Sequence, residues 1–179
     1  MQGVVFHELR SLAQARLGPQ GWESLLDQAG LSRRCYLAFK DYPDTEVVAL
    51  VDTAARMMGQ SRLRVLEELG ERLGPSLLRT YGVLVQPNWT VLDMVEHVER
   101  IHEQVRRDPR LQQPPGVVCQ RVRQDVVKVS YSSPRKLCGL GIGAIRGLAR
   151  HLGESVVVQE RRCMHQGAPT CELEVRQLA

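Results

Sequence analysis

The apolar and polar residues of the chain follow one spacing in its first part and another afterwards. Up to residue 107, apolar residues recur every three or four positions, which is typical of amphipathic helices. After the stretch DPRLQQPPG at 108–116, short segments alternate apolar and polar residues, which predicts half-buried strands. We therefore expect an α+β fold, with a helical N-terminal half and a small antiparallel sheet in the C-terminal part.

Glycine and proline residues set the expected bounds of these elements. Helices are predicted at 2–17, 21–31, 44–58, 61–73, 76–85 and 90–107, and the pair Gly74-Pro75 is expected to end the fourth of them. A Gly-rich stretch at 136–153 predicts one more helix. A hairpin should turn at Arg123–Asp125, and the later strands at 155–163 and 170–178 are joined by the loop MHQGAP.

Composition and charge limit the classes of protein that fit. The 179 residues suffice for one domain with its own core, and 43% hydrophobic and 25% charged residues are ordinary for a soluble protein. The net charge of +4 comes with scattered arginines and no aromatic stripe, so we expect no nucleic-acid partner. The sequence shows no apolar run of membrane-spanning length and no signal peptide, which predicts a cytoplasmic protein without a membrane partner. In that compartment the five cysteines stay reduced, which favours metal or redox chemistry over disulfides.

One histidine lies on an otherwise apolar helix face. At helical spacing, positions 91, 94, 95, 98, 101, 102 and 105 share a face, and all of them except His102 are Val, Ile or Met. A core histidine bonded to a backbone carbonyl would explain this pattern. A neutral imidazole among Val and Ile side chains also suits an axial ligand of haem iron, with the apolar residues against the porphyrin. His97 points away from this face, and we expect it to be solvated.

The second strand of the predicted hairpin ends in polar side chains where apolar ones are expected. Tyr131, Ser133 and Arg135 follow at alternate positions, so they should share one face of an extended segment. They offer a phenol, a hydroxyl and a guanidinium, and a guanidinium binds a carboxylate through two parallel hydrogen bonds. A turn with a surface arginine is the simpler interpretation, but haem carries two propionate carboxylates that need such donors.

These features together resemble the H-NOX family, the haem nitric oxide/oxygen-binding domains related to the sensor domain of soluble guanylate cyclase. The similar features are His102 on its helix, the pair Pro114-Pro115 and the motif Y-x-S-x-R at 131–135. The stretches MQGVVFHEL, GWESLL and YPDTEVVALV also resemble the N-terminal half of the family. The resemblance covers nearly the whole chain. It implies a single domain over 1–179, with haem between a distal helical subdomain at 1–60 and a proximal subdomain with the sheet at 61–179.

The resemblance also implies roles for individual residues and partners. His102 would bind the iron of haem b, and Pro115 would press on the porphyrin. Tyr131, Ser133 and Arg135 would hold the propionates. Such domains are gas sensors that bind NO and CO and not enzymes, and in bacteria they usually regulate a separate histidine kinase or cyclic-di-GMP enzyme.

The same resemblance bears on which gas is bound. In the members that bind O2, a Tyr five residues after the motif Arg donates a hydrogen bond, and here that position is Leu140. Val5 and Leu9 of the first helix would face the same pocket and cannot donate either. His7 could turn inward after a small rotation of that helix. The resemblance therefore implies selective NO binding, followed by release of His102 from the iron.

A group of cysteines predicts a second site. Cys163, His165 and Cys171 lie in the loop CMHQGAPTC, and Cys138 at the start of the Gly-rich helix could come near it. Three thiolates and an imidazole form a tetrahedral zinc site, whereas three small buried thiols are the simpler interpretation. A zinc-binding bacterial subset of the family is similar, with a His where this chain has Glu160. We expect His165 as the fourth ligand and Glu160 as the alternative, because imidazole usually completes a thiolate-rich site.

Two other functions are compatible with these residues. A zinc-thiolate redox sensor would lose its zinc when Cys138, Cys163 or Cys171 is oxidised. A haem enzyme such as a peroxidase would need a polar acid–base group on the distal side, where the expected residues are apolar. Cys35 and Cys119 have no partners in either scheme, and we expect them to be core thiols.

Overall fold

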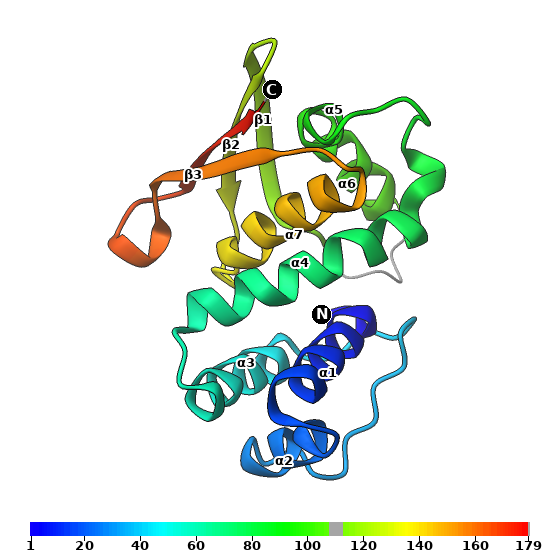
Figure 1. Cartoon of the computed structure of the whole chain (residues 1–179), viewed down its shortest axis with the longest axis vertical. Coiled ribbons are helices and arrows are strands. Elements are labelled where there is room, and N and C mark those ends of the chain that lie inside the picture. Colours follow the sequence, from blue (N-terminus) through cyan, green and yellow to red (C-terminus); the bar gives the residue numbers. More distant parts are fainter. Residues whose placement is uncertain (108–112, 179) are drawn as a thin grey trace.

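The computed structural model describes residues 1–107 and 113–178, and its helices and sheet lie on two sides of one long helix (Figure 1). The helices α1 (Gly3–Leu17), α2 (Gly21–Gln28) and α3 (Asp44–Met58) gather on one side of α4 (Arg62–Tyr81). The sheet and α7 (Cys138–His151) lie on the other side. This arrangement confirms the predicted α+β class.

The helix α4 continues through Gly74-Pro75, so the prediction that this pair ends a helix at residue 73 is wrong. Pro75 cannot donate a hydrogen bond to the carbonyl of Glu71. That carbonyl faces α7 so closely that a Cβ added to Gly147 would lie 2.1 Å from its oxygen. An added Cβ at Gly143 would meet the backbone of α4 at 2.0 Å in the same way. Glycine therefore lets α4 and α7 pack backbone to backbone, and this packing keeps the chain helical beyond the proline. A 3-10 helix, η1 (Gly82–Leu84), follows.

The helix predicted at 90–107 is interrupted once. It forms two helices, α5 (Val91–Glu96) and α6 (Val98–Arg106). His97 lies between them with φ −97° and ψ 7°. Its Nδ1 is 2.8 Å from the carbonyl of Asp93, and its ring stacks on Trp89 with centroids 4.6 Å apart. His97 is therefore half-buried and packed between two helices, so it is solvated only in part.

One antiparallel sheet holds four strands in the order β1-β2-β4-β3. The strands are β1 (Gly116–Arg123), β2 (Val126–Ser132), β3 (Val156–Arg162) and β4 (Cys171–Gln177). The predicted hairpin is present as β1 and β2, and the two later strands also pair with each other. Val129 of β2 stands opposite Leu173 of β4, and both are buried against residues of α5 and α7. The alternation seen in the sequence thus marks the face of the sheet that these helices cover.

Two hydrophobic cores meet beside α4 and α7. The first joins α1, α2, α3 and the first half of α4, while the second joins α5, the sheet and α7. Val65, Leu66 and Leu69 place α4 in the first core, although the expected boundary at residue 60 assigns it to the second part. The division into 1–60 and 61–179 stays a prediction. In residues 1–107 and 113–178, no helix combines the length and the hydropathy needed to cross a membrane.

Candidate haem cavity and metal site

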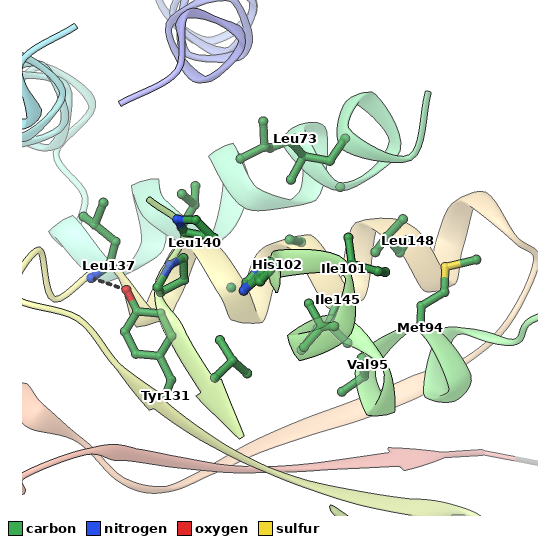
Figure 2. A pocket seen from close by; sticks show the side chains of 18 of the residues that line it. Leu73, Met94, Val95, Ile101, His102, Tyr131, Leu137, Leu140, Ile145 and Leu148 are labelled. Atoms are coloured by element: carbon green, nitrogen blue, oxygen red, sulfur yellow. Dashed lines mark hydrogen bonds between the residues drawn. The ribbon is translucent and has the colours of Figure 1, made fainter. Parts of the chain in front are cut away.

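A cavity of about 340 Å³ lies where the two cores meet. Residues of α1, α4, α5, α6, α7 and the first two strands line it, and nearly all of their side chains are apolar. Figure 2 shows side chains of this wall: Leu73, Met94, Val95, Ile101, Ile145 and Leu148. An apolar space of this size suits a ligand with a large apolar surface, since binding removes that surface from water.

His102 is the one histidine among the described residues that line this cavity. Its Nδ1 atom is buried and has no hydrogen-bond partner in the described part of the chain. Burial, and then the nearby Arg106 guanidinium, lower the pKa of His102 to about 4, while the backbone of Pro115 acts in the opposite direction without satisfying Nδ1. The imidazole is therefore neutral at pH 7. A neutral, unpaired imidazole among apolar side chains fits an axial ligand of haem iron.

The predicted apolar face around His102 is present despite the break at His97. Its members that line the cavity are Met94, Val95, Val98, Ile101 and Val105. Arg121 of β1 fixes the end of α5, because its guanidinium lies 2.6 Å from Asp93 and 2.7 Å from Glu96. Burial raises the pKa of Asp93, but the hydrogen bonds from Thr90 and the charge of Arg121 outweigh it and lower that pKa. The ion pairs thus anchor the helix that leads into α6.

Tyr131 and Ser133 take different positions relative to the cavity. Tyr131 lines the cavity, and its hydroxyl accepts a hydrogen bond from the Leu137 N–H at 3.3 Å (Figure 2). β2 ends at Ser132, so the expectation of one strand face from Tyr131 to Arg135 is wrong. Ser133 is buried and accepts a hydrogen bond from the N–H of Arg135 at 3.3 Å. Its hydroxyl orders the turn that leads to α7.

Arg135 and Pro115 both border the cavity. The Arg135 guanidinium donates to the carbonyl of Gln113 and lies 3.3 Å from a carboxylate oxygen of Asp44 in α3. Pro115 accepts a hydrogen bond from Arg106 at 3.3 Å through its carbonyl. A guanidinium beside a phenol at the edge of an apolar cavity fits the carboxylates of a haem.

The residues expected on the distal side divide into two groups. Val5 and Leu140 line the cavity, whereas Leu9 is fully buried in the first core and is not part of the cavity wall. His7 is exposed, and its Nε2 lies 2.8 Å from the carbonyl of Tyr36. His7 therefore stays outside the cavity in this structure.

Sequence reasoning missed a pair of polar residues in the cavity wall. Gln2 and Tyr81 both line the cavity, and their side chains are hydrogen bonded to each other. They lie 79 positions apart, one before the first helix and one at the end of α4. No periodicity or motif connects two such positions, so only the fold brings them together.

The predicted cysteine group is present in the sheet subdomain. Cys138, Cys163 and Cys171 are buried, and the sulfur of Cys163 lies 3.8 Å from each of the other two. Two ligands held at about 2.3 Å from a tetrahedral zinc stand about 3.8 Å apart, so this spacing fits zinc. Burial, followed by interactions with its neighbours, raises the pKa of the Cys138 thiol. Thiolates this close together need a cation to offset their charge.

Glu160, and not His165, lies with the three thiols. The ligand atoms of Cys138, Glu160, Cys163 and Cys171 all lie within 4.8 Å of one another, and Glu160 Oε1 is buried without a hydrogen-bond partner in the described residues. His165 is exposed, and its Nε2 lies 2.9 Å from the carbonyl of Lys136. The preference for His165 disagrees with this arrangement, which favours the alternative, Glu160.

The remaining cysteines are separate from this group. Cys35 is exposed, which corrects the expectation that it is a core thiol. Cys119 is half-buried, and burial, with the charges of Glu99 and Glu96, raises the pKa of its thiol to about 12. Cys119 is therefore a protonated, unreactive thiol at pH 7.

Comparisons with known proteins identify the family of this chain. The sequence model of the haem-NO-binding family matches residues 2–160. An H-NOX protein from S. oneidensis in the Fe(II)NO ligation state has a similar structure, with a TM-score of 0.90, 24% identity and 100% of each chain covered. The Fe(II) unliganded H-NOX protein from K. algicida has a TM-score of 0.85 and 17% identity, with 100% of this chain and 97% of that chain covered. A mutant of the T. Tengcongensis H-NOX has a TM-score of 0.84 and 17% identity, with 100% of this chain and 98% of that chain covered. No curated protein sequence matches the chain.

The chain belongs to the haem-NO-binding, or H-NOX, family. Domains of this family bind haem and sense diatomic gases such as NO and CO. They are sensor domains and not enzymes.

Proposed function

We propose that this protein is a haem-based sensor of nitric oxide in which His102 is the axial ligand of haem b. The observation that carries the proposal is the neutral imidazole of His102, whose Nδ1 is buried without a partner among the described residues, in the wall of an apolar cavity. A buried polar group without a hydrogen-bond partner costs about 1–3 kcal/mol, so its persistence supports a ligand that is bound in the functional protein.

The residues around the cavity would hold the other parts of the haem. Arg135 and Tyr131 at its edge would bind the propionates, and Ser133 would support them by ordering the turn. Pro115 would lie against the porphyrin. Apolar side chains of α4, α5 and α7 would cover its faces and keep water away.

Selectivity for NO would follow from the apolar side chains in the wall. The haem iron supplies the position at which a diatomic gas binds. O2 depends more than NO on a hydrogen-bond donor beside it, and Val5 and Leu140 offer none. CO would also bind, because it needs no such donor.

His102 would be released from the iron when NO binds, and this release would start the signal. α6 packs on β1 and α5, while α1 packs on α4, so movement of His102 would shift the second core relative to the first. The ion pair between Arg135 and Asp44 links the two cores and would respond to that shift. A switch requires two states of the protein, one of which is favoured when NO is bound and the other when it is absent.

The partner that reads this change is proposed to be a separate histidine kinase or cyclic-di-GMP enzyme in the cytoplasm. The support is the likeness to the family, whose bacterial members commonly act on such enzymes. A reducing compartment also suits the free thiols of Cys138, Cys163 and Cys171.

A second candidate function is a zinc-thiolate redox sensor. The 3.8 Å sulfur spacings and the nearby carboxylate of Glu160 favour a bound Zn²⁺. A peroxide would oxidise two of the thiolates to a disulfide, would itself be reduced to water or an alcohol, and zinc would leave. The two functions could be connected. Cys138 begins α7, and this helix also lines the haem cavity.

Absorption spectra of the purified, reduced protein test the proposal. We expect a haem spectrum that changes on addition of NO to that of a five-coordinate complex, and no stable oxygenated spectrum in air. A protein that takes up no haem would contradict the proposal as a whole. A stable oxygenated spectrum would contradict the selectivity alone, and an NO complex that stays six-coordinate would contradict the release of His102.

A further inference from the structure

One wall of the cavity contains a phenol that the proposed selectivity does not account for. Among the described residues that line the cavity from the N-terminal segment, α1, α4 and α7, only Gln2 and Tyr81 carry a side-chain nitrogen or oxygen. The α1 and α4 part of this wall lies away from the helix that carries His102, because α1 packs on α4 whereas α6 packs on β1 and α5. A free phenol here would be a hydrogen-bond donor on the side where a bound gas is expected.

The Tyr81 hydroxyl is occupied by Gln2. The oxygen of Tyr81 lies 2.8 Å from Nε2 and 3.0 Å from Oε1 of Gln2. A phenol has a single O–H donor, so a hydroxyl that donates to Oε1 of Gln2 cannot donate into the cavity. Both side chains are half-buried, which shields this bond from competition by water.

The main chain holds Gln2 in place. Gln2 forms an isolated β-bridge with Asp41, and the next residue, Gly3, donates to the carbonyl of Lys40 at 2.8 Å. A Cβ added to Gly3 would lie 1.9 Å from the carbonyl oxygen of Leu37, so the two segments are in close contact. The main chain of Gln2 is therefore anchored outside the cavity, at the point from which its side chain reaches the tyrosine hydroxyl.

We propose that Gln2 determines the gas specificity of the cavity by occupying the Tyr81 hydroxyl. With Gln2 in place, the Tyr81 hydroxyl is not available to a bound gas, so O2 gains nothing from Tyr81. Without Gln2, the phenol keeps its place in the wall and its O–H turns toward the cavity. This inference rests on the proposed function. It adds a role for Gln2, which keeps the cavity selective for NO although Tyr81 lines the cavity.

Three variants test the inference: Gln2→Leu, Tyr81→Phe and the double variant Gln2→Leu/Tyr81→Phe. Gln2→Leu should release O2 at least about tenfold more slowly than the double variant, a difference equivalent to about 1.4 kcal/mol. The infrared C–O stretch of the CO complex should shift to lower frequency in Gln2→Leu alone, because only there does a donor reach the gas. The wild type, Tyr81→Phe and the double variant should agree with one another.

The possible failures are distinguishable. If the wild type takes up no haem, the proposed function and this inference both fall. If haem and NO bind but Gln2→Leu equals the double variant in O2 release and in C–O stretch, the inference alone is wrong. Faster O2 release from Gln2→Leu than from the wild type also overturns it, because Gln2 would then itself be the donor. The carbon NMR signal of Tyr81 Cζ can be assigned by its loss in Tyr81→Phe. It should shift in Gln2→Leu, which checks that the hydrogen bond between Gln2 and Tyr81 exists in solution.

Discussion

The apolar cavity and the thiol cluster meet at Cys138, which contributes to both, yet they would hold their ligands by opposite means. The cavity uses a large apolar surface from many elements and a single imidazole, that of His102. The cluster uses four ligand atoms within 4.8 Å of one another and almost no surface. A ligand held by surface tolerates changes in single wall residues, whereas a metal held by four atoms depends on each of them.

The sharpest test of this difference is metal content after single substitutions in the cluster. We expect about one zinc per chain in the wild type and none in Cys171→Ser, because three ligands do not close a structural site. Glu160→Gln should lower the zinc content strongly, while His165→Ala, its matched control, should keep it. Elemental analysis of protein purified without chelator measures this.

The result for the fourth ligand can also go the other way. Full zinc in Glu160→Gln with loss in His165→Ala would show that the arrangement around Glu160 does not persist in the metal-bound protein. Haem uptake should be unchanged in Glu160→Gln, because Glu160 does not line the cavity. A parallel loss of haem would mean that loss of zinc also disturbs the cavity, through Cys138.

The cavity side of the comparison was largely predictable because helical periodicity extends across it. The apolar face that ends at Val105 includes His102 although the helix is interrupted at His97, because α6 keeps helical spacing from Val98 to Arg106. The pairing of Gln2 with Tyr81 was not predictable, because it depends on how α4 ends. That end depends in turn on glycine contacts with α7, which carry α4 past Pro75.

The cluster was predictable in its cysteines and not in its fourth ligand. In a regular strand, side chains alternate between faces, so Glu160 and Cys163 would point to opposite sides of the sheet. The register of β3 shifts between Glu160 and Arg162, and this irregularity allows both residues to face the same site. A bulge leaves no mark in the spacing of apolar residues, which explains why chemical preference alone pointed to His165.

The lowered pKa of His102 in the cavity wall predicts how the stability of the haem-free protein depends on pH. His102 has a pKa of about 4 in the fold and about 6.5 in the unfolded chain, where it is solvated. Between these values the unfolded chain binds more protons, so the free energy of unfolding should fall by up to about 3 kcal/mol as pH decreases from 6.5 to 4. Urea denaturation of haem-free wild type and His102→Leu at several pH values measures this contribution. The variant should lack it, and an equal pH dependence in both proteins would show that the pKa of His102 is not lowered in the fold.

The most direct test of the account is the haem content of His102→Gly. Glu103→Gly is the matched control, since it places glycine at the neighbouring, exposed position of the same helix, at a similar cost of up to about 1 kcal/mol. Both variants and the wild type would be purified together, and haem would be measured by absorbance with and without added imidazole. The account predicts haem in the wild type and in Glu103→Gly, little or none in His102→Gly, and recovery of haem in that variant when imidazole replaces the lost side chain. Unchanged haem content and an unchanged spectrum in His102→Gly would contradict it.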